Sequence, residues 1–92
     1  MSEASAGTAL VTGAARRVGR AIACDLARAG WDVAVHCNAS RADAEETARL
    51  ISAAGGRAQV VQADLRDEAA VRGLLGEVER VLGPVSILVN NA

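Results

Sequence analysis

Apolar residues along the chain gather into short dense runs, separated by longer stretches in which apolar and polar positions alternate. Four of these runs are rich in Val, Leu, Ile or Ala and are too short for helices, which favours strands. In one run, Val33, Ala34 and Val35 are consecutive, which is typical of a strand buried on both faces of a parallel sheet. The predicted strands cover residues 8–11, 31–37, 58–62 and 85–89.

The stretches between these runs predict three amphipathic helices. The clearest lies at 68–82, where apolar residues recur at i, i+3, i+4, i+7 and i+11. Asp67 or Arg66 is expected near its first turn, and Gly83 and Pro84 end it. Its apolar stripe consists of Val71, Leu74, Leu75, Val78 and Leu82.

Two further helices are predicted at 18–29 and 41–54. The first has an apolar stripe that can face a sheet, and the second follows an S-x-x-D sequence, Ser40 to Asp43, that can form a capping box. The glycine that follows the first helix, Gly30, is a plausible C-terminal cap. The two inner faces comprise Val18, Ile22, Leu26 and Ala29 in the first helix, and Ala44, Ala48 and Ile51 in the second.

Strands and helices alternate strictly in this prediction, and their order indicates the fold class. Parallel strands joined by helices use right-handed crossovers, so we expect an α/β fold with a Rossmann-like, doubly wound parallel sheet. The expected strand order is 3-2-1-4, with three helices. The length of 92 residues favours one domain with a modest core.

Composition narrows the range of functions. The net charge of −1 gives no electrostatic reason to expect binding to nucleic acid or to an anionic membrane surface. The sequence begins without a signal peptide, and no apolar run approaches the length of a membrane helix, so we expect a cytoplasmic protein. Cys24 and Cys37 are too few for a disulfide framework, and no metal site is expected.

Residues 8–20, TALVTGAARRVGR, join the first predicted strand to the first helix through a glycine loop. Gly13 would permit a sharp turn after the strand, and Gly19 would let the helix start close to the sheet. In this layout the first N–H groups of the helix and the positive end of its dipole can face a pyrophosphate. The segment therefore predicts a dinucleotide-binding turn.

This turn resembles that of the short-chain dehydrogenase/reductase family, which reads TGxxxGxG. Thr12, Gly13 and Gly19 match, whereas Arg17 stands at the middle glycine. The variant TGAARRVG is similar to that of pteridine reductase-like and oxoacyl-carrier-protein reductase-like members. The resemblance to pteridine reductases implies that an arginine at this place reaches toward the cofactor phosphate and the substrate.

The end of the second predicted strand indicates which nicotinamide dinucleotide is bound. An NAD site expects an acidic residue there to hold the ribose 2′-hydroxyl, and the stretch HCNASR has none. Arginine pairs well with phosphate, so Arg16, Arg17 and Arg41 favour NADP(H). Pteridine reductase-like relatives have a histidine and a serine at the positions of His36 and Ser40. The serine can equally serve only as a helix cap.

Two later motifs match the same family. Asp64 and Leu65 follow the third predicted strand, where the resemblance implies contact with the adenine ring, although an aspartate there is also a common turn residue. Asn90-Asn91-Ala92 matches the first three residues of the family motif NNAG, which borders the cofactor. The complete expected cofactor site comprises Gly13, Arg16, Arg17, Val18, Gly19, His36, Asn38, Ser40, Arg41, Asp64, Leu65, Asn90, Asn91 and Ala92.

Catalysis in this family depends on a serine and a YxxxK pair further along the chain. All ten basic residues here are arginine, and the sequence contains neither lysine nor tyrosine. We therefore expect residues 1–92 to be the N-terminal part of one Rossmann domain, truncated after the fourth strand and inactive alone. It would be the NADP(H)-binding portion of an oxidoreductase that, in the full-length relative, transfers hydride between NADPH and a carbonyl or pterin-like substrate.

Two other interpretations stay open, a non-catalytic NADP-binding module and an inactive gene fragment. A nucleotide hydrolase is not expected, because its phosphate-binding loop needs the lysine of G-x-x-x-x-G-K-[ST]. We expect full-length relatives to be homo-oligomers. We expect this chain to self-associate or to pair with a complementing chain, because its apolar fourth strand would lie at the edge of the sheet.

Overall fold

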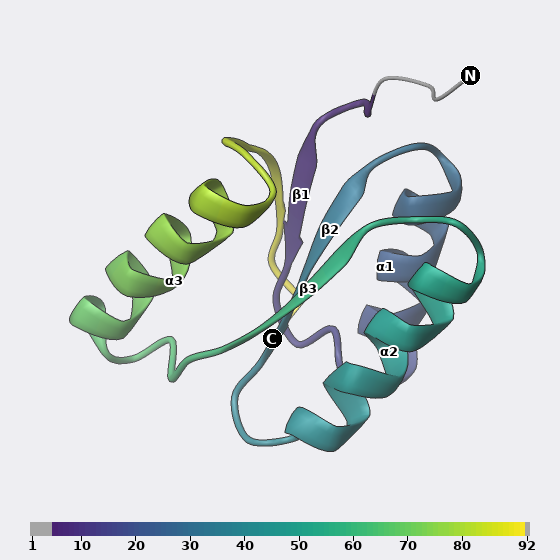
Figure 1. Ribbon diagram of the computed structural model, residues 1–92. Coiled ribbons are helices and arrows are strands. Elements are labelled where there is room, and N and C mark those ends of the chain that lie inside the picture. Colours follow the sequence, from purple (N-terminus) through teal and green to yellow (C-terminus); the bar gives the residue numbers. More distant parts are fainter. Residues whose placement is uncertain (1–4, 92) are drawn as a thin grey trace.

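The computed structural model describes residues 5–91, which contain four strands and three helices in strict alternation. The elements are β1 (Thr8–Val11), α1 (Arg17–Arg28), β2 (Asp32–Cys37), α2 (Arg41–Ala53), β3 (Ala58–Gln62), α3 (Glu68–Val81) and β4 (Val85–Val89). The strands are parallel in the order β3-β2-β1-β4, which confirms the predicted α/β fold. Helices α1 and α2 cover one face of the sheet and α3 covers the other (Figure 1).

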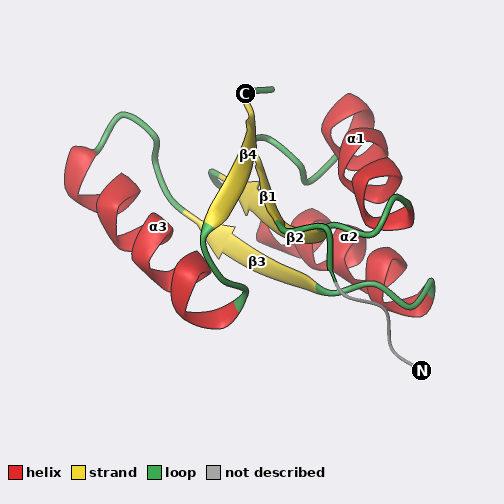
Figure 2. Cartoon of the chain, turned by 90° about the horizontal axis from the view of Figure 1, so that it is seen from above, coloured by secondary structure: helices red, strands yellow, loops and turns green. Residues whose placement is uncertain are grey.

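Strand β2 is buried along its whole length, because it lies between β1 and β3 with helices on both sides. Its side chains alternate between two apolar clusters, as expected for a pleated strand. Val33 and Val35 pack in the cluster that contains Ile51 of α2, whereas Ala34 packs with Leu74 of α3. Figure 2 shows the sheet between the two layers of helices. The prediction of a strand buried on both faces is confirmed.

Helix α1 confirms the middle of the predicted apolar stripe, where Ile22 and Leu26 pack against the core, but not its two ends. Val18 was expected on the inner face, but its exposed fraction is 63%. The buried residues of α1 are Gly19 and Ala23. The start of the helix lies so close to the preceding loop that only glycine fits at the contact. The side of the helix that carries Gly19 and Ala23 therefore faces inward. Ala29 is also exposed.

The two predicted helix caps differ in outcome. Asp67 caps α3, since its carboxylate accepts hydrogen bonds from the N–H groups of Ala69 and Ala70 at 3.0 and 3.2 Å. Ser40 precedes α2, but its side chain makes no capping hydrogen bond, so the expected capping box is wrong. Its ψ of 57° departs from the extended conformation in which a capping side chain reaches back to the helix N–H groups.

Strand β4 forms one edge of the sheet in the described part of the chain, where it pairs with β1. Leu88 in this strand has an exposed fraction of 62%, and Leu75 on α3 is exposed although it was expected on the inner face of that helix. The stripe on α3 is therefore narrower than predicted, with Leu74 and Val78 at its buried centre. None of the helices within residues 5–91 has the length and apolarity needed to cross a membrane.

Candidate functional site

An open cavity of about 610 Å³ lies at the carboxyl ends of β1 and β2. Ligands of parallel α/β sheets bind at this edge, where the loops that follow the strands meet. The volume falls in the usual range for small-molecule sites. The cavity is lined by Gly13, Ala15, Arg16, Arg17, Val18, Gly19, Cys37, Asn38, Ala39, Ser40 and Asn91.

The turn at Gly13 is held by hydrogen bonds from two strands. Gly13 has a φ of +60°, in the left-handed region that glycine adopts readily, as the sequence predicted. Its N–H donates to Nδ1 of His36 at 3.1 Å, and the N–H of Ala14 donates to the carbonyl of His36 at 2.9 Å. Nδ2 of Asn91 donates to the Gly13 carbonyl at 3.2 Å. Three hydrogen bonds within the chain therefore hold this loop.

His36 lies behind this loop and is not among the residues that line the cavity. Its side chain is buried, and Nε2 lies 2.9 Å from the carbonyl oxygen of Ala63. Because Nδ1 accepts from Gly13, this geometry requires the tautomer with the proton on Nε2, which donates to Ala63. His36 thus connects the glycine loop to the loop that follows β3.

Gly19 permits a close contact between α1 and the turn. A Cβ atom at this position would lie 2.1 Å from the Gly13 carbonyl oxygen and 2.7 Å from Nδ2 of Asn91. Both distances are far below a van der Waals contact, so any larger residue would push the helix away from the loop. The predicted role of Gly19 in close packing is confirmed.

Arg17 has a φ of 55°, and it is the only non-glycine residue with a positive φ in the part of the chain that the structure describes. The family has its middle glycine at this position, which explains the conformation. An L-residue in the left-handed region is strained. The exposed side chain of Arg17 begins at the rim of the cavity, so the strained residue lies at the candidate site.

The exposed side chain of Arg16 lines the same cavity and reaches the start of α2. Its Nη2 donates to the Ser40 hydroxyl at 3.3 Å, and its Nε lies 3.5 Å from a carboxylate oxygen of Asp43. The Ser40 side chain therefore faces the cavity instead of the helix N–H groups. Arg16 and Ser40 therefore place a guanidinium group, with five N–H donors, and a hydroxyl group beside the end of β2.

Arg41, Asp64 and Leu65 are, like His36, predicted residues that lie outside the cavity lining. Nε of Arg41 donates to Glu45 one turn along α2, at 3.1 Å. The side chain of Asp64 is hydrogen-bonded by Arg66, which lowers the pKa of Asp64 to about 2, and the N–H of Arg66 adds to this effect. Asp64 is thus a charged carboxylate at neutral pH. Leu65 beside it is exposed.

Asn90 and Asn91 follow β4 and connect it to β1. The N–H of Asn91 donates to the Thr12 hydroxyl at 2.8 Å, and Thr12 Oγ1 lies 3.3 Å from Oδ1 of Asn90. Of the two asparagines, Asn91 lines the cavity. Ala92, the last residue predicted for the site, lies outside the described residues.

Cys37 ends β2 at the floor of the cavity, but it is not a reactive group. The thiol is buried, and burial raises its pKa, with the nearby Arg41 opposing the shift. A protonated, buried thiol is a poor nucleophile. Cys37, Ala15 and Ala39 also line the cavity but belong to no functional motif, so the sequence did not identify them.

The structure therefore brings together most of the residues expected from the motifs. Those that line one cavity are Gly13, Arg16, Arg17, Val18, Gly19, Asn38, Ser40 and Asn91. His36, Arg41, Asp64, Leu65 and Asn90 do not line it. The arrangement presents loop N–H groups and arginine side chains at the start of a helix, which suits an anion such as a pyrophosphate.

Known proteins share both the sequence and the fold. The chain is 42% identical over 84 residues to the short-chain dehydrogenase/reductase homolog YusS of Bacillus subtilis, covering 91% of this chain and 77% of YusS. It is 41% identical over 85 residues to the 3-oxoacyl-[acyl-carrier-protein] reductase FabG of Staphylococcus aureus, covering 92% of this chain and 35% of FabG.

A solved structure gives the same result. The FolM alternative dihydrofolate reductase 1 of Brucella suis, in complex with NADP, superposes with a TM-score of 0.87 and 49% identity, over 95% of this chain and 34% of that chain. The present chain thus spans about a third of FabG and of the Brucella protein. Residues 7–92 match the family model for short chain dehydrogenase. The chain belongs to the short-chain dehydrogenase family.

Proposed function

We propose that the chain is the NADP(H)-binding part of a short-chain dehydrogenase-type oxidoreductase. The observation that carries this proposal is the cavity beside the glycine loop, with Arg16 held over the Ser40 hydroxyl at the end of β2. A ribose 2′-phosphate would accept hydrogen bonds from both groups, and Arg17 would add a second guanidinium. The NADP complex of the Brucella relative supports the same cofactor.

The glycine loop would hold the pyrophosphate. Its turn is already fixed by His36 and Asn91, so little conformational freedom would be lost on binding. Asp64 and Leu65 would border the adenine, with the carboxylate charged at neutral pH because of Arg66. When bound, the cofactor supplies the hydride.

We further propose that the longer protein transfers this hydride between NADPH and a carbonyl or pterin-like substrate. The names of FabG, an oxoacyl reductase, and of the Brucella dihydrofolate reductase support these substrate classes. The 92 residues contain no tyrosine and no lysine, so they lack the family's proton-donating pair. Purified alone, the chain should give no turnover of pterins, quinones or oxoacyl thioesters above a blank without protein.

The domain assignment follows from the same relatives. We propose that residues 1–92 are the first third of one Rossmann domain, which is supported by their coverage of 34–35% of the Brucella protein and FabG. A non-catalytic NADP-binding module is the second candidate. YusS favours it, because 84 aligned residues make up 77% of that relative, which is therefore also a short chain.

Calorimetric titration with NADPH and NADH tests the proposal. We expect tighter binding of NADPH, and we expect Ser40→Ala to weaken NADPH more than NADH. Gly13→Val should abolish binding of both, because a β-branched side chain would obstruct the left-handed turn. Equal affinities of the wild-type chain for the two dinucleotides would refute the NADP assignment, and unchanged binding by Gly13→Val would place the ligand elsewhere.

A further inference from the structure

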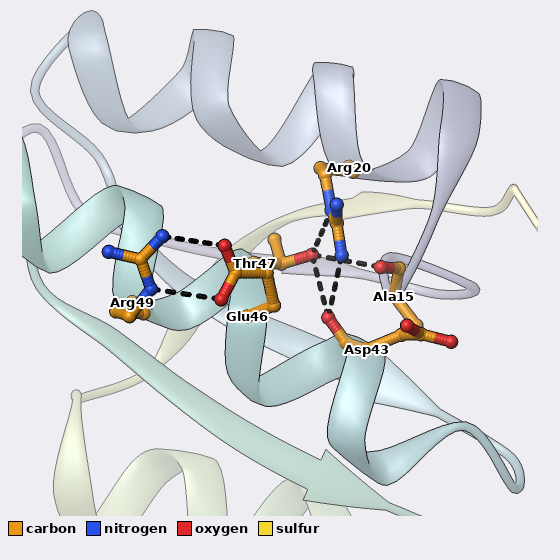
Figure 3. Close-up of polar contacts among 6 residues, drawn as sticks. All are labelled: Ala15, Arg20, Asp43, Glu46, Thr47 and Arg49. Carbon is orange, nitrogen blue, oxygen red and sulfur yellow. Dashed lines mark hydrogen bonds and ion pairs between the residues drawn. The ribbon is translucent and has the colours of Figure 1, made fainter.

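A buried hydroxyl group on α2 contacts the glycine loop. Thr47 lies on the inner face of the helix, and its exposed fraction is 0%. Its Oγ1 donates to the carbonyl oxygen of Ala15 at 3.0 Å (Figure 3). Ala15 stands in the middle of the loop, between the two glycines of the motif, and lines the cavity. No local sequence signal links residues that are 32 positions apart.

Arg20 of α1 completes this contact. Its Nε donates to the Thr47 hydroxyl at 2.9 Å, and its Nη2 donates to the carbonyl of Asp43 at 3.0 Å. The guanidinium thus bridges α1 to the first turns of α2. The Thr47 hydroxyl accepts a hydrogen bond from the charged guanidinium and donates one to a neutral carbonyl. A charged donor on a hydroxyl oxygen strengthens the bond that the hydroxyl itself donates.

The hydroxyl has a second acceptor within reach. Threonine in a helix commonly donates to the carbonyl four residues earlier, which here is Asp43 at 3.3 Å. The Ala15 carbonyl is nearer at 3.0 Å, and the Asp43 carbonyl already accepts from Arg20. The loop carbonyl is therefore the favoured acceptor.

This contact fixes the orientation of one peptide group in the loop. The carbonyl of Ala15 and the N–H of Arg16 belong to the same planar trans peptide, so they point in opposite directions. Holding the carbonyl toward Thr47 turns the Arg16 N–H away from α2. The same peptide leads into Arg16, whose side chain lies over Ser40.

We propose that Thr47 and Arg20 are positioning residues for the glycine loop. The Arg20 guanidinium holds the Thr47 hydroxyl, and the hydroxyl sets the peptide between Ala15 and Arg16 in the orientation that the dinucleotide requires. The proposal rests on the NADP(H)-binding function proposed above. Neither residue touches the cavity, so both act through the loop backbone.

The test separates the hydroxyl from packing. Thr47→Val keeps the shape and removes the hydroxyl, whereas Thr47→Ser keeps the hydroxyl. Thr8→Val is the matched control, because Thr8 is also buried and its hydroxyl donates to the Leu82 carbonyl at 3.2 Å, but it lies at the other end of β1. Arg20→Met, at a half-buried position, repeats the test if Thr47→Val does not fold.

The first readout needs no cofactor. In the 15N-labelled chain, Thr47→Val and Arg20→Met should shift the Arg16 amide signal, whereas Thr47→Ser and Thr8→Val should leave it as in wild type. The second readout is affinity. Thr47→Val should weaken the binding of NADPH and of NADH alike by about tenfold, which corresponds to the free energy of one typical hydrogen bond, and Thr47→Ser should bind as wild type does.

The proposal would be overturned if the Arg16 amide signal in both Thr47→Val and Arg20→Met stayed as in wild type. It would also be overturned if Thr8→Val lost as much affinity for the dinucleotides as Thr47→Val. If the wild-type chain binds neither dinucleotide, the proposed function fails, while the amide readout still decides whether Thr47 and Arg20 position the loop.

Discussion

Replacing Arg17 by glycine should stabilise the fold while weakening the binding of NADPH. Arg17 has a φ of 55°, and an L-residue in this region costs roughly 1–2 kcal/mol. Glycine removes that strain, but it has more freedom to lose on folding, which costs about 0.5–1 kcal/mol. The free energy of unfolding should therefore rise by up to about 1.5 kcal/mol, and the Tm by up to about 12 °C for a chain of this length.

Arg17→Ala is the control for this substitution. Alanine keeps the Cβ atom and so keeps most of the strain, but it removes the guanidinium just as glycine does. Thermal melts of the chain without ligand should place Arg17→Gly above both Arg17→Ala and wild type. Titrations should show that the two variants lose NADPH affinity equally and lose less affinity for NADH. An Arg17→Gly chain that melts at or below Arg17→Ala would refute the idea that backbone strain is stored at this position.

Three further perturbations test other parts of the structure. Gly76→Ala should raise the free energy of unfolding by about 0.5–1 kcal/mol in a thermal melt, because a Cβ atom there meets nothing within 4 Å and alanine favours the helix; a lower Tm would show that α3 packs differently. The Asp64 carboxyl should titrate near pH 2 by NMR, and Arg66→Met should move the pKa toward the ordinary 3.8. An unchanged Asp64 pKa in Arg66→Met would exclude the pairing. Since the pKa of Asp64 is lower in the folded than in the unfolded chain, the stabilisation from this pair is complete above about pH 4 and is lost as the pH falls through about 2. The exposed edge at β4 should cause self-association, which Leu88→Lys should reduce in sedimentation velocity; a monodisperse wild-type monomer at high concentration would contradict this.

The sequence pattern predicted the strands well, and β2 shows the reason most clearly because it is buried along its whole length. The apolar run around Val33 and Val35 can be buried on both faces only if it lies between two layers of helices. The observed strand begins one residue later than the predicted one. The exposure of Val18 on α1 could not be predicted in the same way. Periodicity does not say which side of a helix approaches the loop, and the contact of Gly19 with Gly13 placed Val18 outside.

Motifs located the candidate site but not all of its supports. Ser40 was expected either to cap the helix or to contact the cofactor. Its backbone angles exclude the side-chain cap, and a sequence motif does not specify such angles. The resemblance indicated His36 at the site, whereas its ring lies behind the loop with partners on Gly13 and Ala63. Thr47 was not identified from the sequence, because its partner in the loop is brought near only by the fold.

An NMR titration of the 15N-labelled chain with NADP⁺ tests the central claim most directly, since it reports where the dinucleotide binds. We predict saturable shifts of the amide signals of Gly13, Arg16, Ser40 and Asn91, with the signals of α3 unchanged beyond its first turn. The same titration with NAD⁺ should shift the Gly13 amide but leave Ser40 little changed, because NAD⁺ lacks the 2′-phosphate. Shifts confined to other parts of the chain, or none at millimolar NADP⁺, would contradict the account.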